Sequence, residues 1–167
     1  KYSLNDSTWH DGTKVGQADL VYSLGFQVDW ANKDGDTDLK YEEAYASTYK
    51  PTLETLKGIT YNKDGTADVW YDYNWPMDKN RLAAGGVQFV SPKAGNAGRI
   101  TMVNWTINEA LALLVTEGSK SGTVYSIAQD PSMTEVDVAS PACITDIKAK
   151  LQEMIEKKYV PVYIKDY

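Results

Sequence analysis

Few residues of this sequence could do chemistry, and they stand apart from one another. His10 beside Asp11 could supply a general base, but the chain has a single histidine and no Gly-x-Ser-x-Gly nucleophile motif. Cys143 could carry a reactive thiol in the first turn of a helix, although a small buried side chain is its commoner role. We therefore predict that His10 and Asp11 form a structural turn and that Cys143 lies in the core.

Two loops match ligand-binding motifs only in part. The acidic stretch from 29 to 38 could attract calcium. With Gly35 at the sixth position of a twelve-residue calcium loop, however, Trp30 and Tyr41 occupy positions where carboxylates are needed. The stretch from 118 to 122 does not complete the Gly-x-x-x-x-Gly-Lys-Ser/Thr phosphate loop. We expect both stretches to be solvated loops, and we predict neither a metal nor a cofactor.

A third pattern imitates a serine acyl-transferase. Ser47 to Lys50 spells the Ser-x-x-Lys of penicillin-recognising enzymes, and Lys120 to Gly122 imitates their Lys-Thr-Gly. The nucleophilic serine of those enzymes opens a helix, whereas here we expect Pro51 to end the helix that contains Ser47. The Ser/Tyr-x-Asn element that should lie between the two motifs is missing. We therefore predict that the protein is not an enzyme.

Aromatic residues near position 70 are the candidates for ligand contact. Four side chains could stack against sugar rings or peptide side chains: Trp70, Tyr71, Tyr73 and Trp75. Strand alternation places Trp70 on a polar face and the other three on an apolar face, where core packing is their alternative role. The candidates that we name for ligand contact are Trp70 and Trp75.

Two sequons could accept N-linked glycans in a secreted protein, at Asn5 and at Asn104. Asn104 has an alternative role, because a helix is predicted to begin at Thr106 and the Asn104 side chain could cap it. Both residues remain candidates for glycosylation.

The composition is typical of a folded, water-soluble domain. Of 167 residues, 43% are hydrophobic and 24% are charged, so the chain can bury its own core and we expect one domain over 1–167. The 17 Lys and Arg against 23 Asp and Glu give a net charge of -6, which argues against nucleic acid as a partner. The single cysteine excludes an internal disulfide and a multi-cysteine zinc site. The longest apolar run, 110–115, is far shorter than the ~20 residues that span a bilayer.

Hydrophobic periodicity predicts an α+β fold with a mixed, largely antiparallel sheet and about four helices. The helices are expected at 16–31, 41–50, 106–117 and 141–158, with a helical turn at 78–84 that the glycines at 85 and 86 break. The strands are expected at 2–4, 56–61, 67–75, 87–90, 100–103, 123–127 and 135–138, and 160–164 is expected to be extended. The first helix should bury a stripe that contains Leu20, Leu24, Val28 and Ala31, with Gly25 weakening its middle.

The stretch from Trp9 to Leu24 resembles a signature of the peptide/nickel-type extracellular solute-binding proteins of ABC importers. In that family a strand is followed by aromatic-His-Asp-Gly-Thr-Pro and then by a helix that opens with Thr-Ala-x-Asp. The signature residues present here are Trp9, His10, Asp11, Gly12 and Asp19, whereas Lys14, Gly16 and Gln17 replace the Pro, Thr and Ala of the family.

The resemblance is strongest over 1–30 and continues more loosely over 55–93. The hairpin expected from Leu56 to Trp75, followed by Pro76, is similar to the next hairpin of the family. The stretch from Val87 to Lys93 is similar to the strand that follows it. Residues 95–167 show only helices compatible with the family, so the resemblance covers about half of the chain.

The resemblance implies one lobe of a type II periplasmic-binding-protein-like receptor, extracellular or periplasmic and held at the membrane by a segment outside this chain. Such a receptor captures an oligopeptide or a related small solute and delivers it to an ABC permease in the membrane. This segment would act as scaffold rather than as the principal ligand site. The residues leave one alternative open, a carbohydrate-binding or cell-surface interaction module, which the 12 Tyr, the 5 Trp and the acidity suggest.

Overall fold

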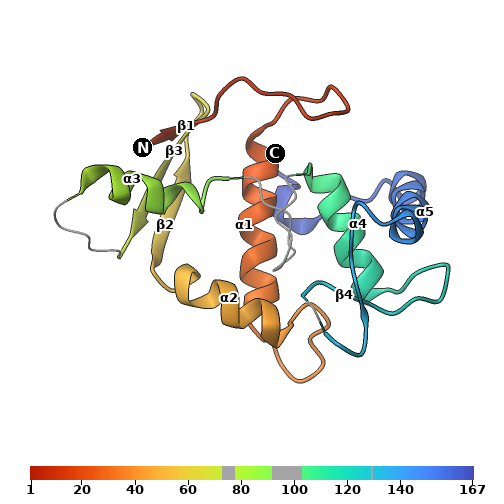
Figure 1. The fold of residues 1–167 in the computed structure, drawn as a ribbon. Helices are drawn as coiled ribbons and strands as arrows, with labels where there is room; N and C mark the ends of the chain where they lie inside the picture. The colour runs from red at the N-terminus through yellow and green to blue at the C-terminus, as the bar shows by residue number, and fades with distance from the viewer. Residues whose placement is uncertain (73–77, 92–102, 129) are drawn as a thin grey trace.

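The computed structural model describes residues 1–72, 78–91, 103–128 and 130–167, which form helices and two small sheets (Figure 1). The α+β prediction is confirmed, with a fifth helix where only a helical turn was expected. The elements are β1 Tyr2–Ser3, α1 Gln17–Ala31, α2 Glu43–Leu53, β2 Leu56–Tyr61, β3 Thr66–Tyr71, α3 Lys79–Val87, α4 Trp105–Thr116, β4 Tyr125–Ser126, β5 Thr134–Glu135, α5 Pro141–Lys157 and the 3-10 helix η1 Val162–Ile164. None of these helices has the length and apolar character to cross a bilayer.

The larger sheet has the order β1-β3-β2 and is antiparallel throughout. The hairpin is confirmed: Tyr61 pairs with Ala67, and the turn between them ends at Gly65, whose φ of 77° favours glycine. A register shift between Leu56 and Gly58 marks a bulge in β2. The residues from 73 to 75 of the predicted second strand lie outside the described residues. The smaller sheet pairs β4 with β5 in parallel. Each of these strands has two residues, so both are shorter than the strands predicted at 123–127 and 135–138.

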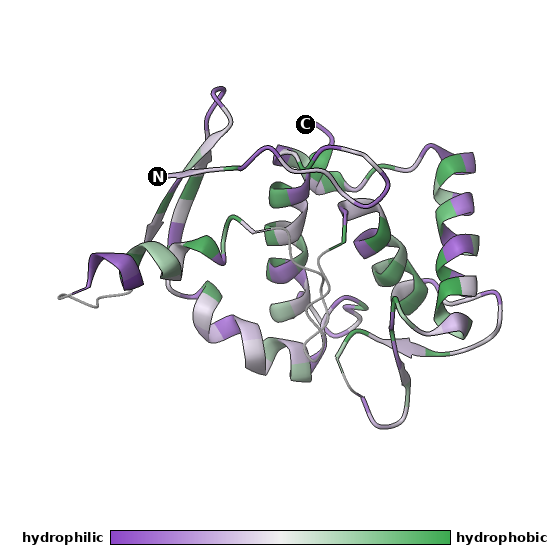
Figure 2. Ribbon diagram, turned by 45° about the horizontal axis from the view of Figure 1, so that its top comes forward, coloured by the Kyte–Doolittle hydropathy of each residue, from purple (hydrophilic) through white to green (hydrophobic). Residues whose placement is uncertain are grey.

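The hydrophobic core lies among the helices. In Figure 1, α1, α4 and α5 lie one beside the next, α1 packs against α2 and η1, and α4 packs against both α1 and α5. Hydrophobic residues cover most of α4 in Figure 2, as expected for a helix with neighbours on two sides. The largest fully buried side chains are Trp30, Tyr22, Tyr45, Leu114 and Ile127. The predicted helices at 106–117 and 141–158 are confirmed as α4 and α5 within two residues at each end.

The stripe predicted for α1 is partly wrong. Leu20 and Ala31 are buried, but Val28 is 42% exposed, and the remainder of the buried face is aromatic and polar, with Tyr22, Phe26 and Trp30. Because α1 has neighbours on several sides, its buried face is wider than one apolar stripe. The prediction for this helix missed three large aromatic side chains of the core, Tyr22, Phe26 and Trp30.

Gly25 in α1 has a packing role that the sequence did not indicate. An ideal Cβ at Gly25 would lie 2.7 Å from Cγ of Tyr163, which is closer than real Cβ contacts. The Tyr163 hydroxyl donates to Asp29 and accepts from Lys40 at 2.9 Å. The predicted extended segment at 160–164 is corrected to the 3-10 helix η1, which places Tyr163 against Gly25.

The strand predicted at 87–90 is wrong, because α3 continues through Gly85 and Gly86 to Val87. These glycines allow α3 to lie against two tyrosines of the sheet, since a Cβ at Gly86 would collide with Tyr2 and would lie 3.1 Å from Cε1 of Tyr71. The hydroxyls of both tyrosines donate to carbonyls of α3. The glycine pair therefore serves close packing of a helix rather than its termination.

Two other expected boundaries also differ. Pro51 lies inside α2, which continues to Leu53, so the expectation that it ends the helix was wrong. Of the strand expected at 100–103, residues 100–102 lie outside the described residues and Val103 is in no strand. At the start of α5, Ser140 occupies the N-cap position but makes no side-chain capping hydrogen bond, and Pro141 supplies the first turn.

Candidate functional site

The signature residues form a closed loop followed by a helix. Thr8 and Lys14 make an isolated antiparallel bridge, and the Trp9 N–H donates to the Thr13 carbonyl at 2.8 Å. Gly12 has a φ of 84°, so the turn needs a residue without a Cβ there. The Asp11 carboxylate accepts from the N–H and hydroxyl of Thr13, and these hydrogen bonds lower the pKa of Asp11. The predicted structural turn at Asp11 is therefore present.

Asp19 joins this loop to two helices. Its carboxylate is buried and accepts from the Trp9 indole N–H at 3.2 Å and from the Gly16 N–H at 3.0 Å. The other oxygen accepts from the backbone N–H of Trp105, the first residue of α4, at 3.1 Å. A carboxylate at the amino ends of α1 and α4 meets their unpaired N–H groups and the positive ends of both helix dipoles. Asp19 therefore fixes the amino end of α4, which is 86 residues away in sequence, against the loop.

Asn104 also links the loop to α4. Its side-chain oxygen accepts from the Ile107 N–H at 3.2 Å, which confirms the capping role, and its amide nitrogen donates to Asp11 at 3.0 Å. A glycan would be attached to this nitrogen, so glycosylation at Asn104 would place the sugar at the contact with Asp11, whereas the capping oxygen is a different atom. Asn5, the other sequon asparagine, is exposed on the chain segment that precedes the loop.

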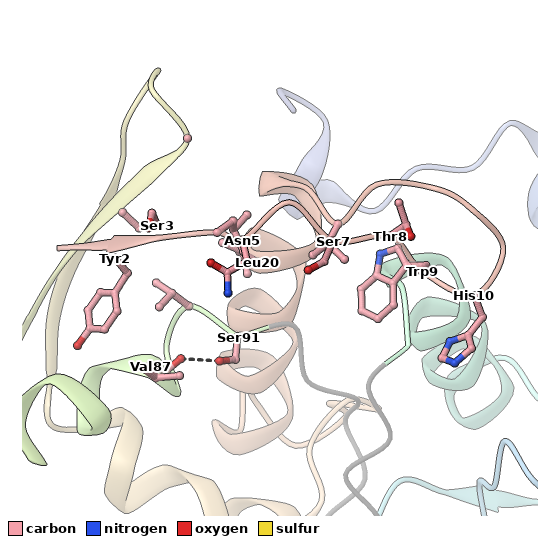
Figure 3. A pocket seen from close by; sticks show the side chains of 15 residues that line it. Tyr2, Ser3, Asn5, Ser7, Thr8, Trp9, His10, Leu20, Val87 and Ser91 are labelled. Carbon is pink, nitrogen blue, oxygen red and sulfur yellow. Dashed lines mark hydrogen bonds between the residues drawn. The ribbon is translucent and has the colours of Figure 1, made fainter. Parts of the chain in front are cut away.

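A pocket of about 450 Å³ lies beneath the segment that leads into the loop (Figure 3). Leu20 of α1, Ala67 of β3 and Val87 of α3 supply apolar walls, and Figure 3 shows Trp9 and His10 at one end of the pocket and Tyr2 at the other. The polar lining residues are Ser3, Asn5, Ser7, Thr8, His10 and Ser91. Such a lining suits a small, mostly apolar group with a few hydrogen-bonding atoms.

Metal-binding clusters and serines paired with a base are the two arrangements that would point to chemistry in this pocket. No cluster of three or more His, Cys, Asp or Glu side chains that could hold a metal occurs in the described part of the chain. The hydroxyl of Ser91, one of the three serines of the lining, donates to the Val87 carbonyl rather than to His10.

The remaining candidates lie elsewhere. Trp70 is exposed on the sheet face opposite the side chains of Val69 and Tyr71, as strand alternation predicts, and Trp75 lies outside the described residues. The Ser47 hydroxyl donates to the Ala44 carbonyl within its own helix. Cys143 is buried as predicted, and burial raises the pKa of its thiol. Trp70, Ser47 and Cys143 are not among the residues that line the pocket.

Two groups of buried polar residues escaped the sequence reasoning. Glu109 in α4 is buried and accepts from the hydroxyls of Tyr22 and Tyr159, each at 2.7 Å, and burial raises the pKa of both tyrosines. Asp146 in α5 accepts from the Ser121 hydroxyl at 2.5 Å and from the Tyr125 hydroxyl at 2.9 Å. Asp146 thus holds the loop at 118–122. Glu109 lies on the side of α4 opposite the stripe of Ile107, Leu111 and Leu114, where a charged residue is expected to be exposed, so the sequence offered no signal for its burial.

Comparisons of the chain with protein-family models, with curated proteins and with solved structures find no match.

Proposed function

We propose that this chain is part of an extracellular or periplasmic receptor that captures oligopeptides, or a related small solute, for an ABC importer. In this proposal the segment is a scaffold without catalytic activity, and the partners of the whole receptor are the solute and a membrane permease. The receptor would be held at the membrane by a segment outside this chain.

The observation that carries the proposal is the joint role of Asp11 and Asp19. Both belong to the stretch that resembles the receptor signature, and both fasten the loop at 8–14 to the amino end of α4. Each of these carboxylates is engaged by hydrogen bonds within the protein, so neither points to a ligand. A signature of this kind maintains the shape of a lobe, which is what a scaffold segment requires.

The pocket under the signature supports a scaffold role more than a principal ligand site. Its walls come from three stretches of this one chain, between 2 and 20, at 65–67 and at 87–91, whereas receptors that close on a solute bind it between two lobes. Its lining is mostly neutral, and the charged ends of an oligopeptide would find few partners in it. We therefore expect the affinity for peptide to need the flanking parts of the receptor.

The experiment is a comparison of peptide binding by two proteins. One is the 167-residue chain, and the other is the full receptor encoded with its flanking sequence. Isothermal titration with a pool of tri- to hexapeptides should show binding by the receptor and none by the chain alone. Tight binding by the chain alone would contradict the scaffold role, and a longer protein that binds no peptide in the pool would contradict the receptor proposal.

A further inference from the structure

The outer face of the β2–β3 hairpin carries an indole that the fold leaves uncovered. Trp70 pairs across the sheet with Gly58 and is 55% exposed. An ideal Cβ at Gly58 would lie 4.0 Å from Cε3 of Trp70, so the ring lies near a strand position that has no side chain. The other face of the sheet meets α3, which lies beside the strands in Figure 1. The hydroxyls of Tyr2 and Tyr71 donate to carbonyls of α3. Trp70 therefore presents a flat apolar surface to solvent, on the face of the sheet that α3 does not cover.

Charged groups border this indole. The ammonium of Lys57 lies 3.2 Å from the carboxylate of Asp72, and both side chains are exposed. An open hollow of about 460 Å³ beside Trp70 is lined by Lys57, Trp70 and Asp72 together with Val69 and Tyr71, whose side chains belong to the other face. The bulge at Leu56 to Gly58 adds Lys57 to the strand beside the hollow. The site thus combines one aromatic face with a hydrogen-bond donor and an acceptor at its edge.

The chemistry of this surface selects among ligands. An apolar protein partner would have to bury the charges of Lys57 and Asp72, which is costly. An anionic ligand would meet Asp72 and Asp68 on a protein whose net charge is -6. An uncharged sugar avoids both the burial of unpaired charges and the repulsion of an anion. The C–H groups of a pyranose face can lie on the indole while the sugar hydroxyls pair with the ammonium and the carboxylate.

We propose that the outer face of the β2–β3 hairpin is a carbohydrate subsite, in which one uncharged pyranose ring stacks on Trp70 and hydrogen-bonds to Lys57 and Asp72. The site lies on a different surface from the pocket beneath the signature, and the proposal does not depend on the receptor function. A sugar-containing solute or a cell-surface glycan could each supply the ring.

The test is a titration of the whole chain with cellohexaose, maltohexaose and mannohexaose, monitored by the NMR signals of the Trp70 indole N–H and of the backbone amides of Lys57 and Gly58, which remain available in the Trp70 variants. We expect at least one of the three to shift these signals at concentrations up to about 10 mM, which is the range of weak single-ring contacts. Trp70→Ala should weaken binding at least tenfold, and Trp70→Phe should weaken it less because a flat ring remains. Asp72→Asn, which removes a charge but keeps an acceptor, should have an intermediate effect.

The matched control is Ile155→Ala, which truncates an exposed side chain on α5 and should bind as the wild type does. Trp70 is exposed, so its removal should leave the thermal unfolding midpoint nearly unchanged, and a folded Trp70→Ala is then available for comparison. The proposal is overturned if Trp70→Ala binds as well as the wild type, or if none of the three sugars shifts the indole signal. A peptide pool that shifts the signal where the sugars do not would overturn it as well.

Discussion

The helical region and the sheet region of this protein are stabilised in different ways. The helical region, which comprises α1, α2, α4, α5 and η1, buries Trp30, Tyr22 and Leu114 almost completely. In the sheet region, which comprises β1 to β3 and α3, Ala67 is the one buried residue of the three strands. The sheet region is held by backbone pairing and by tyrosine hydroxyls that reach α3. Most of the buried hydrophobic surface therefore lies among the helices, and only the sheet face that carries Trp70 is free of α3.

The largest effect that would test this comparison is the loss of a core aromatic residue. Trp30→Ala should lower the free energy of unfolding by about 3–5 kcal/mol, because it removes a fully buried side chain and leaves a cavity. Val69→Ala in β3 should cost about 1 kcal/mol, because Val69 is only half-buried. Urea denaturation followed by circular dichroism measures both values. Equal costs for the two variants would contradict the proposed difference between the regions.

A second effect concerns the junction at Asp19. Asp19→Ala removes the acceptor for three N–H groups, those of the Trp9 indole, Gly16 and Trp105, and should cost about 1–3 kcal/mol. Asp19→Asn keeps one acceptor oxygen and should cost less. Asp166→Ala, at an exposed aspartate near the end of the chain, is the control and should be nearly neutral. If Asp19→Ala unfolded at the same urea concentration as the control, the junction would contribute nothing to stability.

A third prediction is that a substitution in α3 loosens the sheet region without affecting the helical region. Gly86→Ala places a Cβ against Tyr2 and Tyr71, so α3 must move away from the sheet at a cost of about 1–3 kcal/mol. Hydrogen exchange should become faster in α3 and β1 and remain unchanged in α4, because α4 belongs to the helical core. Adding Tyr2→Ala removes the closest obstacle and should restore part of the protection of α3. Faster exchange throughout α4 would show instead that the regions unfold together.

The smallest effect is a dependence on acid in the helical region. Hydrogen bonds from Lys157 and Lys150 lower the pKa of Glu153 in α5 from 4.5 to about 2. Because the pKa is depressed in the folded protein, the stabilisation is present above about pH 4.5 and is lost as the pH falls toward 2. Glu153→Gln should therefore flatten the dependence of the thermal midpoint on pH in this window, and Glu156→Gln, at an exposed neighbour, should not. High salt should reduce the effect, since these groups are near the surface.

Elements with a local signal were predicted well from the sequence. The hairpin was found because apolar and polar residues alternate on both sides of an Asn-Lys-Asp-Gly turn, and α5 was found because Pro141 and a stripe of apolar residues define it. Val87 to Val90 has the composition of a strand but follows two glycines that lie inside a helix. The error arose because glycine permits either a break or a close contact, and only the packing partner decides which occurs.

The candidate site shows the same division. The turn at Asp11 and the cap at Asn104 were predictable, because each depends on residues within three positions along the chain. The bond from Trp105 to Asp19 and the pocket beneath the signature were not, because they join segments that are distant in sequence. Trp70 was placed on the correct face from alternation alone, but its exposure required knowing that α3 covers the other face.

The sequence by itself determined the α+β class, the hairpin, the principal helices and the closed turn at 9–13, because hydrophobic period and turn chemistry act over a few residues. Only the tertiary structure decided that Gly25 admits Tyr163, that Glu109 is held by Tyr22 and Tyr159, and that Asp19 fastens α4. Such contacts depend on which surfaces of distant segments meet when the core is packed. The hydrophobic period of a single sequence does not indicate which distant segments come into contact.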